Sequence, residues 1–175
     1  MTKLLEIYQL GSDVIREVAQ VVEDVQSDEI KQLIEDMIYT CNHLNGVGIA
    51  APQVNASQAI IIMASKPNER YPHAPMMEPT ALINPQIISH SEEMIKDWEG
   101  CLSLPGIRAQ VPRYTQIKVS YTDTNATEHI VTFKDFVARI FQHEYDHLLG
   151  KVFIDRVEST KDIVMEKEYK RILEM

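Results

Sequence analysis

Three residues in the last third of the chain have the types and spacing of a metal site. His143, Glu144 and His147 form the pattern H-E-x-x-H within "QHEYDH". Residues four apart on a helix lie on one face, so both imidazoles would point the same way. The glutamate beside the first histidine is placed to act as general base toward a water molecule on the metal. The pattern therefore predicts a catalytic metal site on a helix.

Two imidazoles do not hold a catalytic metal, so the third ligand has to be found. The longer pattern H-E-x-x-H-x-x-G-x-x-H is matched as far as Gly150, but Phe153 stands where the last histidine belongs. Glu166 and Glu168 are candidates by sequence distance alone. They lie in "MEKEYKR", a mixed-charge run that is typical of a solvated helix face.

Cys101 is the remaining candidate for the third ligand. It lies in "WEGCLSLPG", between glycine turns and outside any helical stripe. Two imidazoles and one thiolate would leave a fourth position for water. The alternative is that Cys101 is a small buried hydrophobe, because sequence distance does not establish proximity. The spacing therefore favours the thiolate over the two glutamates and leaves the choice open.

Composition excludes several other classes of protein. The 175 residues fit a single domain, 1–175, and 45% hydrophobic with 25% charged residues is ordinary for a soluble globular protein. A net charge of −9 without a dense basic block argues against binding nucleic acid or an anionic membrane. No apolar run suits a signal peptide or a membrane span. With only two cysteines, we expect a cytoplasmic monomer with reduced thiols.

The elements that position these residues can be read from periodicity. A helix is expected over 27–46, with Ser27 as N-cap and Cys41 on its apolar stripe as a buried structural thiol. A second helix, 134–150, carries the two histidines and ends near Gly150. A loop is expected at 65–80 and a final helix at 159–175. Strands are expected at 59–63, 81–88, 116–121, 129–133 and 151–155. The strands 116–121 and 129–133 would form a hairpin.

This order of elements predicts an α+β fold. Antiparallel β-sheets would pack around a central metal-binding helix, with one helix near the N-terminus and another at the C-terminus.

Three segments in this order resemble the bacterial peptide deformylase family. Its motif G-x-G-x-A-A-x-Q is present as "GVGIAAPQ", its E-G-C-L-S motif as "EGCLS" and its H-E-x-x-H motif as "HEYDH". The resemblance continues through "LPGIRAQVPR" and "LLGKVFIDR" and covers nearly the whole chain. It implies a metal-dependent hydrolase that removes the N-formyl group from the N-terminal formylmethionine of new polypeptides and releases formate.

The resemblance also implies roles for individual residues. Cys101, His143 and His147 would bind the metal, typically ferrous iron, with zinc, nickel or cobalt able to occupy the same site. Glu144 would be the general acid and base when metal-activated water attacks the formyl carbon. The oxyanion would be held by Gln53 and the backbone N–H of Leu102.

Substrate contacts are expected from glycines and from one helix face. Gly48 lets backbone pass close to the site, and the extended stretch around it would pair with a peptide as an added strand. Gly48 and Gly100 would therefore bind substrate. Phe136 and Ile140 could form one wall of an apolar pocket for the methionine side chain, or they could be plain core.

The partners implied are N-formylmethionyl nascent peptides. Some family members carry a longer basic final helix implicated in docking on the ribosome. Here the chain from Glu158 onward carries five acidic and four basic residues, which gives that contact little support. An ion pair between Arg113 and Asp146 is a further expectation, as a support behind the metal-binding helix.

Overall fold

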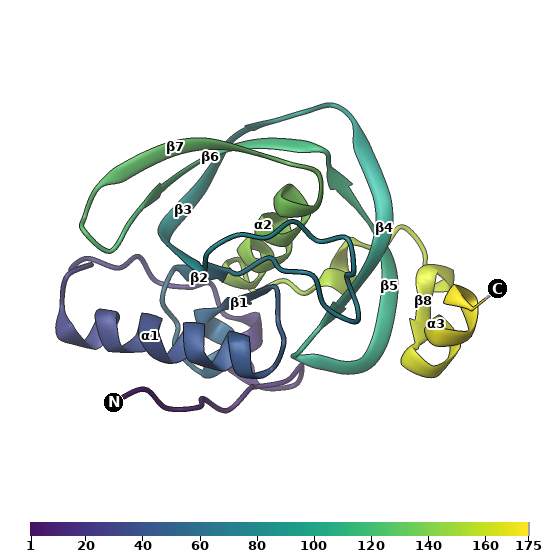
Figure 1. Cartoon of the computed structure of the whole chain (residues 1–175), viewed down its shortest axis with the longest axis horizontal. Coiled ribbons are helices and arrows are strands. Elements are labelled where there is room, and N and C mark those ends of the chain that lie inside the picture. Colours follow the sequence, from purple (N-terminus) through teal and green to yellow (C-terminus); the bar gives the residue numbers. More distant parts are fainter. Residues whose placement is uncertain (175) are drawn as a thin grey trace.

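The structure is a computed structural model that describes residues 1–174. It has the expected α+β architecture, with two antiparallel sheets and three α-helices in the described residues (Figure 1). The helices are α1 (Asp28–His43), α2 (Asp135–Leu148) and α3 (Glu166–Leu173). The strands are β1 (Gly48–Ala50), β2 (Ile60–Met63), β3 (Thr80–His90), β4 (Met94–Cys101), β5 (Leu104–Tyr114), β6 (Gln116–Thr122), β7 (Glu128–Lys134) and β8 (Ile163–Met165).

The larger sheet has the strand order β1-β2-β3-β6-β7 and separates two cores. Successive side chains of a strand point to opposite faces. In β2, Ile60 and Ile62 pack with the apolar face of α1, whereas Ile61 and Met63 pack with α2. Both faces of β2 are therefore covered by helices, which explains why its four residues are all buried and apolar.

The smaller sheet, of order β4-β5-β8, was not expected from the sequence. Strands β4 and β5 form a long hairpin whose register runs from Met94↔Tyr114 to Cys101↔Leu104. The segment "WEGCLSLPG" was expected to be a stretch between glycine turns. It forms the tip of this hairpin instead. Cys101 is the last residue of β4, so a regular element holds its position.

Both long helices match their expected positions. The Ser27 hydroxyl accepts a hydrogen bond from Ile30 N at 3.3 Å, as expected for an N-cap. Cys41 is fully buried in the α1 stripe. The N–H of Gly46 returns to the carbonyl of Cys41 at 2.9 Å and closes the end of the helix.

Two expectations near the C-terminus are wrong. Residues 151–155 are not a strand: Phe153–Arg156 form a 3-10 helix, because the Asp155 carboxylate accepts from Val152 N at 2.8 Å and stabilises a turn. The final helix does not begin at 159. The β-branched Ile163 and Val164 instead extend the small sheet through β8, and the helix spans only Glu166–Leu173. The last position of the predicted helix, residue 175, lies outside the described residues.

The loop between β2 and β3 folds back toward the end of α1. The guanidinium of Arg70 donates to the carbonyl of Asn45 at 2.7 Å, and the Lys66 ammonium donates to the side chain of Asn42 at 3.0 Å. At the base of the loop, Met77 N donates to the carbonyl of Ser65 at 2.9 Å. The expected surface loop is thus tied to the structure at several points.

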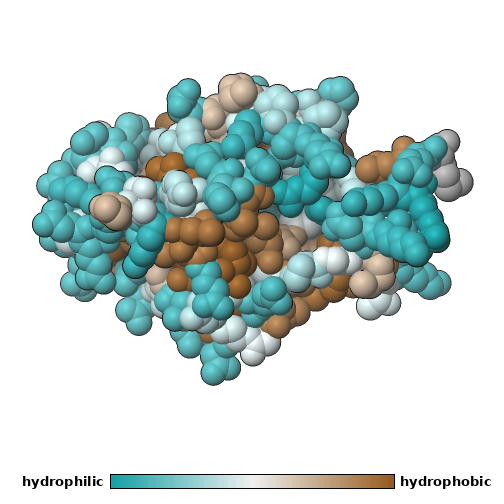
Figure 2. All heavy atoms as spheres, turned by 60° about the horizontal axis from the view of Figure 1, so that its bottom comes forward, coloured by the Kyte–Doolittle hydropathy of each residue, from teal (hydrophilic) through white to brown (hydrophobic). Residues whose placement is uncertain are grey.

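The face shown in Figure 2 is hydrophilic around its rim and hydrophobic in the middle. A hydrophilic rim fits the net charge of −9. None of the helices within residues 1–174 is long and apolar enough to cross a membrane.

Replacing Gly150 by alanine should destabilise the fold through two effects. Gly150 follows α2 with φ +67°, and an added Cβ would lie 2.4 Å from the carbonyl oxygen of Arg16. The left-handed conformation costs a residue with a Cβ about 1 kcal/mol, and the clash adds about 2 kcal/mol more. Urea unfolding of Gly150→Ala should show this combined loss.

Gly106→Ala is the matched control for the steric effect. Gly106 has φ +79°, but an added Cβ would meet no atom within 4 Å. It should therefore lose only about 1 kcal/mol, the conformational part. Equal losses in the two variants would contradict a clash at Gly150.

Candidate metal centre

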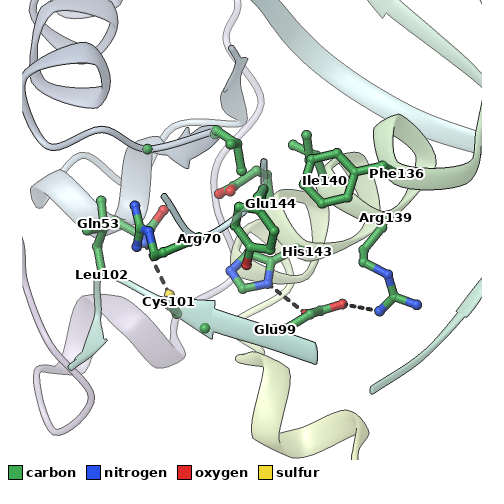
Figure 3. A pocket seen from close by; sticks show the side chains of 15 residues that line it. Gln53, Arg70, Glu99, Cys101, Leu102, Phe136, Arg139, Ile140, His143 and Glu144 are labelled. Carbon is green, nitrogen blue, oxygen red and sulfur yellow. Dashed lines mark hydrogen bonds and ion pairs between the residues drawn. The ribbon is translucent and has the colours of Figure 1, made fainter. Parts of the chain in front are cut away.

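Three side chains from two elements meet at one point, and Figure 3 shows two of them, Cys101 and His143. His143 and His147 come from one face of α2, and Cys101 comes from the end of β4. Each offers one ligand atom, and these three atoms lie within 4.8 Å of one another. The sulfur of Cys101 is 3.4 Å from Nε2 of His147. The structure therefore brings together the thiol and the two imidazoles that the sequence analysis considered as a set.

The alternative third ligands lie elsewhere. The carboxylate of Glu166 binds the guanidinium of Arg108, and Glu168 pairs with Arg171 along α3. Phe153, the residue that breaks the longer histidine pattern, stacks on the ring of His143 with centroids 6.0 Å apart. It therefore contributes packing beside the site.

Glu99 sets the orientation of His143. Its Oε2 is 2.8 Å from Nδ1 of His143, and because an ionised carboxylate only accepts, that nitrogen carries the hydrogen. The other ring nitrogen, Nε2, is then the one left to bind a metal ion. The sequence analysis missed Glu99 as a functional residue. Its position two residues before Cys101 was the available signal, since metal-binding histidines usually donate their second N–H to an acceptor.

A buried ionic network holds Glu99 in place. Arg113 donates to both of its carboxylate oxygens, at 2.8 and 3.0 Å, and Arg139 donates at 2.9 Å. Burial acts to raise the pKa of Glu99, but Arg113 and the His143 hydrogen bond outweigh it and hold the pKa below its usual range. Arg113 also donates to Asp146 at 2.6 Å, which is the ion pair expected from the sequence.

Glu144 lies beside the three ligand atoms and has an unused oxygen. Its side chain is buried, yet Oε2 has no hydrogen-bond partner among the described residues. Burial raises the pKa of this carboxyl to about 7. A carboxyl with a pKa near neutrality can accept and return a proton at physiological pH.

The close approach of Glu144 depends on Gly48 in β1. A Cβ on Gly48 would lie 2.6 Å from Oε1 and 2.9 Å from Cγ of Glu144. Glycine is therefore required at this point of the strand if the carboxylate is to keep its position.

Gln53 points its amide into the site from the 3-10 helix Ala51–Val54 that follows β1. Its Oε1 accepts from Ala50 N at 2.8 Å, which leaves Nε2 directed at the site. Nε2 lies 3.4 Å from the sulfur of Cys101 and 3.2 Å from the hydroxyl of Ser103. The amide nitrogen is thus a fixed donor at the edge of the cluster.

The cluster opens into a pocket with walls from four segments. All the residues proposed from the sequence as substrate contacts line this pocket: Gly48, Gly100, Phe136 and Ile140. Leu102 lines it as well. Arg70 and Tyr71, which the sequence analysis missed, reach it from the loop between β2 and β3, and the Tyr71 ring packs on Phe136 at 5.0 Å. No sequence signal marked them, because only the folded path of the loop brings them here.

The arrangement fits a divalent metal ion. One thiolate and two imidazoles are a common donor set for such an ion. Only three protein ligands form the cluster within residues 1–174, so a metal held by them would keep room for water or substrate. Glu144, with its unused oxygen, lines the same pocket and would serve as proton acceptor for such a water molecule.

Comparison with known proteins gives consistent matches. A family model described as polypeptide deformylase matches residues 4–162. Peptide deformylase 2 of Nostoc sp. is 54% identical over 171 residues, covering 98% of this chain and 96% of the relative. A class I type b peptide deformylase from Acinetobacter baumannii, crystallised with Met-Ala-Ser, is 42% identical with a TM-score of 0.87, over 90% of this chain and 100% of that one. The Thermotoga maritima peptide deformylase is 36% identical with a TM-score of 0.80, over 90% and 99%.

The two cysteines should differ in reactivity when the protein is stripped of metal. Burial works to raise the pKa of the Cys101 thiol, but the imidazoles of His147 and His143 outweigh it and hold the pKa well below the ordinary value. Burial raises the pKa of Cys41 to about 12, and Cys41 is fully buried. At pH 7, iodoacetamide should therefore modify Cys101 and spare Cys41, as read by peptide mass spectrometry.

Adding back zinc should protect Cys101, because a coordinated thiolate is no longer a free nucleophile. Equal modification with and without zinc would mean that Cys101 is not a ligand.

Proposed function

This chain belongs to the polypeptide deformylase family, and from that premise we propose how its pocket removes the formyl group from N-formylmethionyl peptides and releases formate. The observation that carries the proposal is the meeting of Cys101, His143 and His147 beside a buried carboxylate, Glu144, with an unused oxygen. The enzyme is a metal-dependent hydrolase acting on a linear amide.

The proposed ligands are Cys101, His143 and His147, and the proposed ion is ferrous iron. The donor set also suits zinc, nickel and cobalt, and the resemblance to the family is what favours iron. When bound, the ion supplies positive charge that polarises the formyl group and lowers the pKa of a water molecule. Glu99 fixes the His143 tautomer for this task.

Glu144 is the proposed general acid and base. Its free Oε2 takes a proton from the attacking water, and the same oxygen then delivers that proton to the departing amine. Burial raises the pKa of this carboxyl, which strengthens it as an acceptor of the proton. Gly48 keeps the carboxylate within reach by having no side chain.

Two neutral donors are proposed to hold the oxyanion. The Nε2 of Gln53 is fixed by the bond that its Oε1 accepts from Ala50. The backbone N–H of Leu102 belongs to the tip of the β4–β5 hairpin, directly after Cys101. Neutral donors stabilise developing negative charge without competing for the metal.

The substrate is proposed to bind as an added strand. β1 is the terminal strand of its sheet, so the pocket side of Gly48 offers an unpaired edge. The methionine side chain would pack on Phe136 and Ile140, which are pocket wall in this structure. The Met-Ala-Ser peptide bound to the relative from Acinetobacter baumannii supports the same occupant here.

The whole chain, 1–175, is proposed to act as one catalytic domain, as a cytoplasmic monomer on nascent peptides. A thiolate ligand needs a reducing compartment, and Cys41 and Cys101 are both unpaired. The short α3 has acidic residues in its first turn and basic residues in its last. We propose no ribosome contact for such a helix.

Formate release from formyl-Met-Ala-Ser is the direct test. Protein prepared with ferrous iron without oxygen should release formate rapidly. Glu144→Ala should lower kcat roughly 10³-fold through loss of proton transfer, with its metal content unchanged. Absence of release from folded, metal-loaded wild-type protein would overturn the proposal.

Gly48→Ala should slow the reaction through Glu144. The new methyl group would push the carboxylate aside, and a displacement near 1 Å can lower kcat about 10²-fold. Steady-state kinetics of the single and double variants would separate the causes. The double variant Gly48→Ala/Glu144→Ala should have the same kcat as Glu144→Ala alone. If the two reductions in kcat multiply instead, Gly48→Ala does not act through Glu144.

A further inference from the structure

A second hollow adjoins the catalytic pocket on the side of the C-terminal helix. We call it the α3 groove: it lies between residues 44–45, the loop 66–70 and one face of α3. Arg70 lines both the pocket and the α3 groove, so the two hollows adjoin at its side chain. In Figure 1, α3 lies beside β8 at the far end of the molecule from α1.

α3 is held firmly at the rim of the pocket. Arg108 of β5 donates to the two carboxylate oxygens of Glu166 at 3.1 and 3.0 Å, and its guanidinium lies 5.4 Å from the ring centre of Tyr169. The Tyr169 ring also packs edge-on against Trp98 at 5.1 Å. These contacts make α3 a fixed wall.

Arg108 also connects this wall to the pocket itself. It lies so close to Gly100 that a Cβ there would stand 1.8 Å from the Nη1 atom. Gly100 lines the catalytic pocket. Arg108 therefore contacts both the pocket lining, at Gly100, and α3, at Glu166.

The lining residues place the α3 groove at one end of the pocket. The pocket is lined by Gly46, Val47 and Gly48, with Glu144 beside Gly48, and the preceding residues 44–45 line the groove. A peptide with its formyl end at Glu144 that runs antiparallel to this segment would pass Gly48, then Gly46, and then reach the groove. At about 3.3 Å per residue, the chain reaches the groove after about four residues.

We propose that the α3 groove binds about residues four to seven of the polypeptide substrate, with formylmethionine counted as residue one. This inference rests on the proposed function. The exposed side chain of Leu173 offers apolar surface, and the charged groups that line the groove balance. The cations are Lys66, Arg70 and Lys170, and the acids are Glu69, Glu166 and Glu174. With equal numbers of basic and acidic residues, the groove selects for no particular charge on the bound peptide. This suits an enzyme that acts on many different nascent chains.

The test compares a short and a long substrate. The short one is formyl-Met-Ala-Ser, and the long one adds four uncharged residues, Ala-Leu-Ala-Ser. The test variant combines Lys170→Ala with Leu173→Ala, two residues of the groove wall. The matched control combines Arg171→Ala with Ile172→Ala, neighbours on the same helix that do not line the groove.

Wild-type enzyme and the control should show a kcat/KM about fivefold higher for the long peptide. The test variant should lose this gain and keep its activity on the tripeptide, which also shows that it is folded. A gain retained in the test variant, or absent from the wild type, would overturn the groove proposal. Failure of wild-type enzyme on the tripeptide would instead overturn the proposed function.

Discussion

The buried carboxylate of Glu99 is the constraint on which the geometry of the pocket depends. A carboxylate so far from water is tolerable only when its oxygens are fully satisfied, because removing one partner of such a group costs about 3–5 kcal/mol. Its partners come from different elements: Arg113 from β5, and Arg139 and His143 from α2. Satisfying one carboxylate therefore fixes the helix against the hairpin. The sulfur of Cys101, two residues further along β4, is placed opposite the histidines as a result.

Two carboxylates within this small region are pushed to opposite behaviour by their surroundings. Glu99 is enclosed by arginines, so its pKa is held below the usual range and it stays an acceptor. Glu144 is equally buried but has an oxygen with no partner among the described residues, and burial raises its pKa to about 7. One carboxylate is therefore structural and the other is able to exchange a proton. Such a separation of pKa values is how enzymes assign different tasks to chemically identical groups.

Local patterns predicted the parts of the molecule that depend on local physics. The stripe and N-cap of α1, the histidine face of α2 and the β6–β7 hairpin follow from periodicity and turn residues, and the structure has all three. The β4–β5 hairpin was missed because "MIKDWEGC" is largely exposed and lacks an alternating apolar pattern. The residues of β8 were predicted as part of a helix. A strand of three residues forms only where it can pair with the edge of a neighbouring strand, here β5. Arg70 and Tyr71 could be identified only from the structure, since the folded path of their loop brings them to the pocket.

The position of β2 between two cores has a consequence for how the enzyme comes apart. Its four side chains belong alternately to the core under α1 and to the core under α2, so neither core can open while the other stays intact. The two cores should therefore unfold as one cooperative unit. Anything that binds only the folded pocket then also protects the parts of the chain that pack on this strand, including α1. Occupancy of the active site becomes a determinant of how long the enzyme survives proteolysis.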